Sequence, residues 1–148
     1  MTTAFSHIGV CVSDLDRSVR FYVEGLGFEA AESWTIGAEY GTLMELPGVE
    51  LTSQFLRRDG AALELLHYGS PGAVGPAERR PVNQLGLTHL CFRVDDVDAV
   101  AGRLAELGGT VHDHTRTTFP DADGAPQLDF VYCTDPDGTR IELMRLPG

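Results

Sequence analysis

Hydrophobic and polar residues alternate in two similar segments, one in each half of the chain. The alternating apolar positions are Ile8, Val10 and Val12 in the first segment, and Leu90, Phe92 and Val94 in the second. Because successive side chains of a strand point to opposite faces, each segment predicts a strand with one buried face. His7 and His89 hold matching places at the start of these segments, on the face opposite the apolar residues.

A helical pattern follows each of these strands. The apolar positions with helical spacing are Leu15, Val19, Tyr22 and Leu26 in the first half, and Val97, Val100, Leu104 and Leu107 in the second. Asp14 and Asp96 come just before these positions, where a carboxylate can accept hydrogen bonds from the free amides of a helix N-terminus. Glycines end both patterns. We therefore expect one amphipathic helix in each half.

Three strand-like segments follow each helix, so the predicted plan of each half is strand, helix, three strands. The segments are residues 28–36, 51–57 and 62–68 in the first half, and 110–117, 128–133 and 139–146 in the second. Leu63-Glu64-Leu65 is echoed by Ile141-Glu142-Leu143 on the last strand of each half. If the leucines and the isoleucine pack under the helices, Glu64 and Glu142 must face away from them.

These halves predict a single α+β domain over residues 1–148, built from two tandem modules. Module 1 covers residues 4–68 and module 2 covers residues 87–147. Residues 69–86 hold several prolines and glycines and read as a linker over the surface. An insertion at residues 37–48 carries aromatic and apolar side chains that could close over a cleft. Two curved sheets side by side would form a cup, with the helices outside.

The composition narrows the classes of partner. A chain of 148 residues, 43% hydrophobic, can bury a core of its own. Its net charge of −11 would repel nucleic acid and anionic membrane surfaces. We expect a cytoplasmic protein, because the N-terminal residues do not resemble a signal peptide and no apolar run is long enough to span a membrane. Three cysteines in a reducing compartment are expected to be free thiols.

Four side chains face the inside of the predicted cup and suit a metal ion: His7, Glu64, His89 and Glu142. Each histidine alone reads as an ordinary core residue, but both recur together with a glutamate. Burial of an unpaired carboxylate is costly, so two glutamates turned toward a shared cup argue for a cation. Two imidazoles and two carboxylates suit one divalent ion, which could be Ni, Co, Mn, Zn or Mg.

The halves resemble the vicinal oxygen chelate superfamily, also called the glyoxalase, bleomycin-resistance and extradiol-dioxygenase superfamily, over essentially the whole chain. The matching motifs are His7, Asp14 to Ser18 leading into Phe21-Tyr22 and Leu26-Gly27, Leu63-Glu64-Leu65, Thr88-His89-Leu90, and Asp135-Pro136-Asp137-Gly138 before Ile141-Glu142-Leu143. The resemblance implies paired βαβββ modules, a curved mixed sheet around one cup-shaped metal site, and commonly a homodimer.

The number of ligands points to a subgroup of that superfamily. Its extradiol dioxygenases use three metal ligands, two histidines and one glutamate. Glyoxalase I and methylmalonyl-CoA epimerase-like enzymes use a fourth metal ligand, at the place where this chain has Glu64. The resemblance therefore implies a metal-dependent isomerase, epimerase or lyase. Such an enzyme abstracts a proton next to a carbonyl of a small hydroxy-carbonyl or 2-oxo substrate, with Glu142 and Glu64 as candidate bases.

Other interpretations stay open. The epimerase pattern adds an acid on the third strand of module 1, but residues 51–56 contain none and only Glu50 stands at the entrance, which weakens the case for a coenzyme A thioester. A non-catalytic drug- or metabolite-binding protein of the bleomycin-resistance type is the main alternative, and an extradiol dioxygenase is less favoured. His112 and His114 could line the mouth of the cup, and Arg79 and Arg80 could meet an anionic substrate. Solvated positions are the simpler interpretation for all four.

Overall fold

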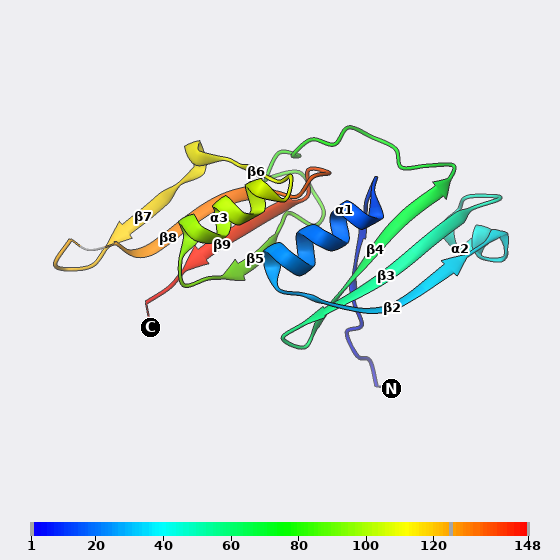
Figure 1. Cartoon of the computed structure of the whole chain (residues 1–148), viewed down its shortest axis with the longest axis horizontal. Coiled ribbons are helices and arrows are strands. Elements are labelled where there is room, and N and C mark those ends of the chain that lie inside the picture. The colour runs from blue at the N-terminus through cyan, green and yellow to red at the C-terminus, as the bar shows by residue number, and fades with distance from the viewer. Residues whose placement is uncertain (1, 125, 148) are drawn as a thin grey trace. The chain divides into compact units, whose positions relative to one another are not determined.

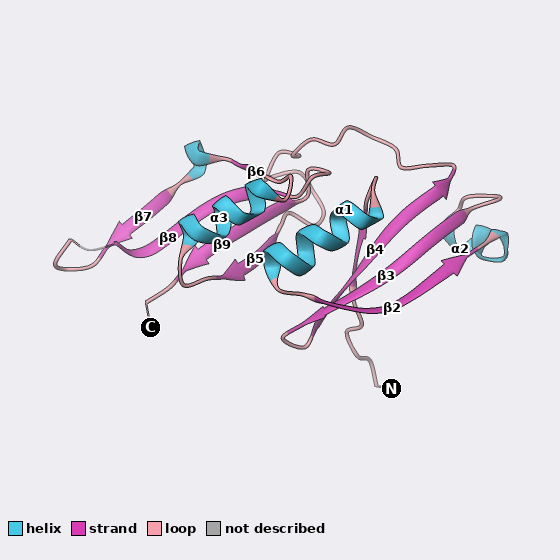
Figure 2. Cartoon of the chain, in the orientation of Figure 1, coloured by secondary structure: helices cyan, strands magenta, loops and turns pink. Residues whose placement is uncertain are grey.

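The computed structural model describes residues 2–124 and 126–147 and has two compact units, Met1–Pro76 and Ala77–Gly148. In each unit the strands form one mixed sheet, and a helix packs on one of its faces (Figure 1, Figure 2). The predicted α+β class with one sheet in each module is confirmed. The boundary between the units lies inside the predicted linker.

Unit 1 contains a four-stranded sheet, and its helices lie in the connections between the first and second strands along the chain and between the second and third. Its elements are β1 (Ile8–Cys11), α1 (Leu15–Arg20), the π-helix η1 (Phe21–Gly25), β2 (Glu29–Ile36), the 3-10 helix η2 (Ala38–Tyr40), α2 (Gly41–Met44), β3 (Glu50–Arg58) and β4 (Ala61–Ser70). The strand order is β1-β4-β3-β2. In this order β1 is an edge strand. It runs parallel to β4, and the other neighbouring strands are antiparallel.

The core of unit 1 lies between the sheet and the first helix. Asp14 caps α1 by accepting a hydrogen bond from the Arg17 backbone amide at 2.9 Å. The predicted single helix in fact changes from α to π geometry after Arg20, and Phe21 and Tyr22 in the π segment are fully buried. Leu63 and Leu65 of β4 are also buried, and Glu64 between them faces away from this core.

Unit 2 repeats this plan with one more strand. Its elements are β5 (Leu90–Arg93), α3 (Val97–Glu106), β6 (Thr110–Val111), the 3-10 helix η3 (Asp113–Thr115), β7 (Thr117–Pro120), β8 (Pro126–Thr134) and β9 (Arg140–Arg145). The order is β5-β9-β8-β6, with β7 also paired to β8, and the edge strand β5 is parallel to β9. Asp96 caps α3 at the Ala99 amide, and α3 packs on β8 and β9.

The strand predicted at residues 110–117 is wrong as a single element. The chain leaves β6 after Val111, turns through η3 and starts again as β7. Side chains hold this turn: Thr115 Oγ1 donates to the His112 carbonyl at 2.8 Å and accepts from the Tyr132 amide at 2.9 Å. Such local bonds compete with the ladder of a sheet, which alternating apolarity alone does not reveal.

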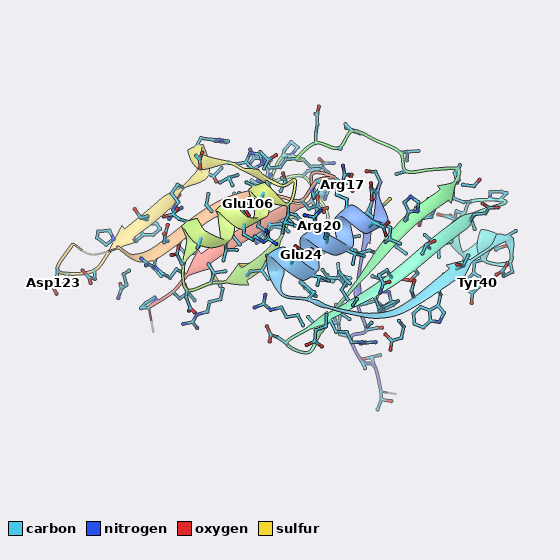
Figure 3. The ribbon with its side chains drawn as sticks, in the orientation of Figure 1. Arg17, Arg20, Glu24, Tyr40, Glu106 and Asp123 are labelled. Atoms are coloured by element: carbon cyan, nitrogen blue, oxygen red, sulfur yellow. The ribbon has the colours of Figure 1, made fainter. Side chains whose placement is uncertain are left out.

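The insertion predicted at residues 37–48 holds two short helices, η2 and α2, and its outer side chains face solvent. Tyr40, beside α2 in Figure 3, is 45% exposed, and Leu43 is 73% exposed. Closure of this segment over a cleft stays a prediction. Within the described residues, no helix combines the length and the apolar character that crossing a membrane requires.

Candidate active site

The first candidate half-site lies in unit 1, where His7 and Glu64 meet. His7 comes just before β1, and Glu64 lies on the neighbouring strand β4, opposite Gly9. The His7 Nε2 atom is 3.0 Å from Glu64 Oε2. Ser53, from β3, donates a hydrogen bond to Glu64 Oε1 at 2.5 Å, and the Phe55 ring packs edge-on against the His7 ring. Both oxygens of this carboxylate are therefore engaged.

Unit 2 carries the second half-site with the same geometry. His89 comes just before β5, and its Nε2 atom is 3.1 Å from Glu142 Oε2. Tyr132 of β8 stands directly opposite Glu142 of β9 and packs its ring against His89, in the place that Phe55 holds in unit 1. Cys91 of β5 is the other neighbour of Glu142 in the sheet.

A hydroxyl group precedes each histidine and engages the other ring nitrogen. Ser6 Oγ is 2.9 Å from His7 Nδ1, and Thr88 Oγ1 is 2.8 Å from His89 Nδ1. Such a contact orients an imidazole, so that Nε2 points toward the carboxylate in both units. The sequence analysis assigned no role to Ser6, Thr88, Ser53 or Tyr132. Repetition of a hydroxyl residue before each histidine was the signal for the first two.

The glutamates are partly buried and influence their neighbours. The side chains of Glu64 and Glu142 are 16% and 18% exposed. Burial, together with the charge and hydrogen bond of Glu142, raises the pKa of the Cys91 thiol to about 11. Burial, then Glu142, also raises the pKa of Tyr132. A divalent cation fits this donor set, because it would offset the negative charge and bind imidazole and carboxylate together.

A pocket opens beside the second half-site within unit 2. It has a volume of about 250 Å³ and is lined by Thr115, Thr117, Phe130, Val131, Tyr132 and Glu142. Its size suits a small molecule. Its lining combines the aromatic residues Phe130 and Tyr132 with polar residues such as Thr115 and Glu142, so the pocket offers both apolar surface and hydrogen-bonding residues.

The structure thus brings the four predicted ligands together in two pairs, His7 with Glu64 and His89 with Glu142. No cluster of three or more histidine, cysteine, aspartate or glutamate side chains that could hold a metal ion occurs within residues 2–124 and 126–147. Each half-site supplies two ligands, and neither unit alone provides the four that the sequence predicts.

Comparison with known proteins gives a consistent result over nearly the whole chain. The family model described as the Glyoxalase/Bleomycin resistance protein/Dioxygenase superfamily matches residues 4–143. An ethylmalonyl-CoA/methylmalonyl-CoA epimerase from Cereibacter sphaeroides is 31% identical over 146 residues, which cover 97% of this chain and 98% of that protein. A probable lactoylglutathione lyase from Vibrio parahaemolyticus is 31% identical over 139 residues, covering 94% and 88%.

Solved structures agree on the fold. A glyoxalase family protein from Bacillus cereus superimposes with a TM-score of 0.82 over 100% of this chain and 97% of that one, at 19% sequence identity. At this identity the likeness concerns the fold alone. The names of the related sequences, an epimerase and a lyase, favour an enzyme that isomerises or cleaves its substrate.

Proposed function

The chain belongs to the Glyoxalase/Bleomycin resistance protein/Dioxygenase superfamily, and on this premise we propose that it is a metal-dependent isomerase, epimerase or lyase. It acts by proton abstraction next to a carbonyl of a small hydroxy-carbonyl or 2-oxo compound. The observation that carries this proposal is the repeated pair of a histidine Nε2 and a glutamate Oε2, 3.0 Å apart in unit 1 and 3.1 Å apart in unit 2.

The proposed metal ligands are His7, Glu64, His89 and Glu142, which hold one divalent ion. Four ligands of this kind leave coordination positions for substrate oxygens on an ion that takes six. When bound, the ion polarises the substrate carbonyl and stabilises the negative charge that develops on its oxygen. Ser6 and Thr88 orient the two imidazoles, and Ser53 orients the Glu64 carboxylate.

The chain's own carboxylates move the proton. Glu142 is the first candidate base, because it lines the pocket of unit 2, where a substrate carbon can approach it. Glu64 is the second candidate, since it occupies the matching place in unit 1. Tyr132 lines the same pocket, and its hydrogen bond with Glu142 orients that carboxylate beside the pocket.

The ligand pairs favour this proposal over a non-catalytic binding protein. A protein that only sequesters an apolar drug needs a lined cavity, and two partly buried glutamates, each beside an oriented histidine, would bring a cost without a benefit to it. A coenzyme A thioester is not part of the proposal, because Glu50, the first residue of β3, is the only acid on that strand and residues 51–58 carry none.

Proton exchange tests the proposal directly. The metal-loaded protein is incubated in deuterated water with a panel of small 2-hydroxy-carbonyl and 2-oxo compounds, and loss of the proton next to the carbonyl is followed by NMR. We expect exchange with at least one compound, and a Glu142→Gln variant that keeps some metal but exchanges about 100-fold more slowly or worse.

Glu106→Gln is the matched control, since Glu106 lies at the end of α3 (Figure 3) and its side chain is 71% exposed. This variant should exchange at the wild-type rate. Undiminished exchange in Glu142→Gln would show that the base is another residue. No exchange with any compound would argue against proton abstraction as the reaction.

A further inference from the structure

A cluster of basic side chains in unit 2 lies outside the proposed metal ligands. Its members are Arg79, His112, His114 and Arg140, and we call it the basic cluster. Arg79 Nη2 donates to His114 Nε2 at 3.5 Å, and the His112 and His114 rings are 5.9 Å apart between centroids. The Arg140 guanidinium stacks over the Tyr132 ring at 4.8 Å. Four groups that carry or can accept positive charge therefore lie together.

Two buried nitrogen atoms of the basic cluster have no hydrogen-bond partner. They are Arg79 Nη1 and His112 Nε2. Within the described residues, no carboxylate lies at ion-pair distance from Arg79 or Arg140, although Arg140 is only 7% exposed. Buried polar groups in folded proteins are almost always paired, and buried charges even more so. Arg79 Nη1 is a donor that lacks an acceptor, and His112 Nε2 lacks one as well when it carries the imidazole proton.

Another arginine of the same unit shows how the fold satisfies a guanidinium when no ligand is involved. Arg116 binds both oxygens of Asp129 at 2.5 Å and reaches Asp98 at 2.7 Å. These partners raise its pKa further above the ordinary value. The absence of comparable carboxylates around Arg79 and Arg140 is thus a local feature, in a chain whose net charge is −11.

The electrostatics of the basic cluster agree with this difference. Burial, then the charges of Arg79, His114 and Arg140, lowers the pKa of His112, and only Asp113 acts in the opposite direction. His112 is therefore in surroundings that disfavour positive charge, which a bound anion would compensate.

The backbone holds the basic cluster in place. Arg140 Nη2 donates to the Arg80 carbonyl at 2.5 Å, which ties the segment before β5 to the start of β9. In the turn between β8 and β9, Gly138 lies so close to Glu78 that an added Cβ would stand 2.8 Å from the Glu78 carbonyl carbon. Both sequence neighbours of Arg79, Glu78 and Arg80, are therefore held in place by contacts with other parts of unit 2, and these contacts fix the backbone position of Arg79.

We propose that Arg79, His112 and Arg140 form a binding site for an oxyanion group, a carboxylate or a phosphate, of a small molecule. Guanidinium and imidazole N–H groups match the acceptors of such an anion in number and geometry. Arg140 and Glu142 are alternate residues of β9 and so point to the same face of the sheet, with Tyr132 in contact with both residues.

This position has a consequence that rests on the proposed function. A molecule whose carbonyl end reaches Glu142 would place its anionic end in the basic cluster, about two strand residues or 7 Å away. The substrate of the proposed reaction is then an anion, with its carboxylate or phosphate group some carbons from the reacting centre. The anion site itself requires no metal ligand.

Direct binding of simple anions tests the site. Inorganic phosphate and acetate are titrated separately into the full chain at constant ionic strength, and the imidazole resonances of His112 are followed by NMR, assigned with a His112→Asn variant. We expect a saturable shift with at least one anion. A response to phosphate alone would identify a phosphate site, and a response to acetate as well would identify a site for carboxylates too.

Variants show which residues bind the anion. Arg79→Gln and Arg140→Gln should each raise the dissociation constant of the anion about tenfold or more. If Arg140→Gln does not fold, because Arg140 is the more buried of the two, the result for Arg79→Gln alone decides the test. Arg103→Gln on α3 removes the same charge and should change it by less than about twofold. Equal effects of Arg79→Gln and Arg103→Gln, or no saturable shift in the wild type, would overturn the proposal.

A metal-ligand variant separates this site from the proposed function. His7→Ala alters unit 1 and leaves every member of the basic cluster in place, so it should keep the phosphate or acetate response of the wild type. Loss of the response in His7→Ala would assign the anion to the metal instead and would overturn the anion site. Retention of the response would support it, whatever the exchange experiment shows.

Discussion

The carboxylate of Glu64 is held by neighbours that differ from those of Glu142. Ser53, itself fully buried, donates to Glu64 at 2.5 Å, whereas Tyr132 and Cys91 stand around Glu142. A short bond to a carboxylate orients it. Glu142 has hydrogen bonds with Cys91 and Tyr132 and also lines a pocket, so it is the glutamate better placed to act on a substrate.

Removal of the Ser53 hydroxyl should weaken metal binding. In Ser53→Ala the Glu64 carboxylate loses the donor that fixes its position, and loss of such a supporting contact typically lowers metal affinity 10- to 100-fold, by rough estimate. Titration against a competing chelator measures the change. Ser33→Ala, on the exposed strand β2, is the control and should bind metal like the wild type. An unchanged affinity in Ser53→Ala would exclude this supporting role.

The parity of the strands predicted that the histidines and glutamates lie on the faces opposite the helices, but it predicted neither their pairing nor the residues that support them. His7 and Glu64 could be placed on one face from the alternation of apolar residues around them. Ser53 and Tyr132 lie on other strands, and their proximity depends on the register between β3 and β4 and between β8 and β9. A single sequence does not determine that register. The role of the four residues as metal ligands stays a prediction.

Among the elements, the turn between β8 and β9 has the strictest backbone requirement. Asp135, which is buried, accepts bonds from the Asp137 and Thr139 amides at 3.0 and 2.7 Å, and Gly138 has a φ of +88°. This turn supports the segment at Glu78 that precedes the basic cluster. Asp-Pro-Asp-Gly is a sequence that favours a turn, but its contact with a segment far away in the sequence could not be foreseen.

Replacement of Gly138 by alanine should destabilise unit 2. The side chain would meet the Glu78 backbone at 2.8–2.9 Å in a left-handed backbone conformation, so we expect a loss of about 1–2 kcal/mol or more in the free energy of unfolding. Denaturant unfolding measures it. Gly102→Ala in α3 is the matched control, because a Cβ there meets no atom, and it should be neutral or stabilising. Equal stabilities would refute the close approach.

Residues 110–117 show the limit of strand prediction at this scale. Thr110, Val111 and Thr117 have side chains that favour strands, and all three do lie in β6 or β7 next to β8. Between them, Arg116 is drawn to Asp98 and Asp129, which lie on other elements. Tertiary ion pairs and the Thr115 hydroxyl outweigh local propensity here, whereas the overall α+β class followed from periodicity alone.

At the scale of the whole molecule, each unit contains two of the four proposed metal ligands. A complete site can therefore be built from the two units of one chain or from units of two chains in the homodimer that we predict. The linker predicted at residues 69–86 permits both.

Mixed variants distinguish the two arrangements. His7→Ala and His89→Ala should each bind much less than one metal ion per chain, as elemental analysis after chelation and refilling would show. If the site is shared, unfolding and refolding the two variants together should restore one intact set of histidines in each heterodimer. If the site lies within a chain, mixing should restore nothing. Full metal content in both single variants would remove these histidines from the site.

Within the described residues, β1 and β5, the strands that follow the proposed ligand histidines, are each paired on one side only. The open side of such a strand presents amide and carbonyl groups that another strand can join. A chain that failed to cover these edges would expose two templates for uncontrolled strand addition beside the proposed site. Such a chain should precipitate more readily at high concentration, under crowding and on heating. The solubility of the protein, and not only its activity, then depends on how these two edges are covered.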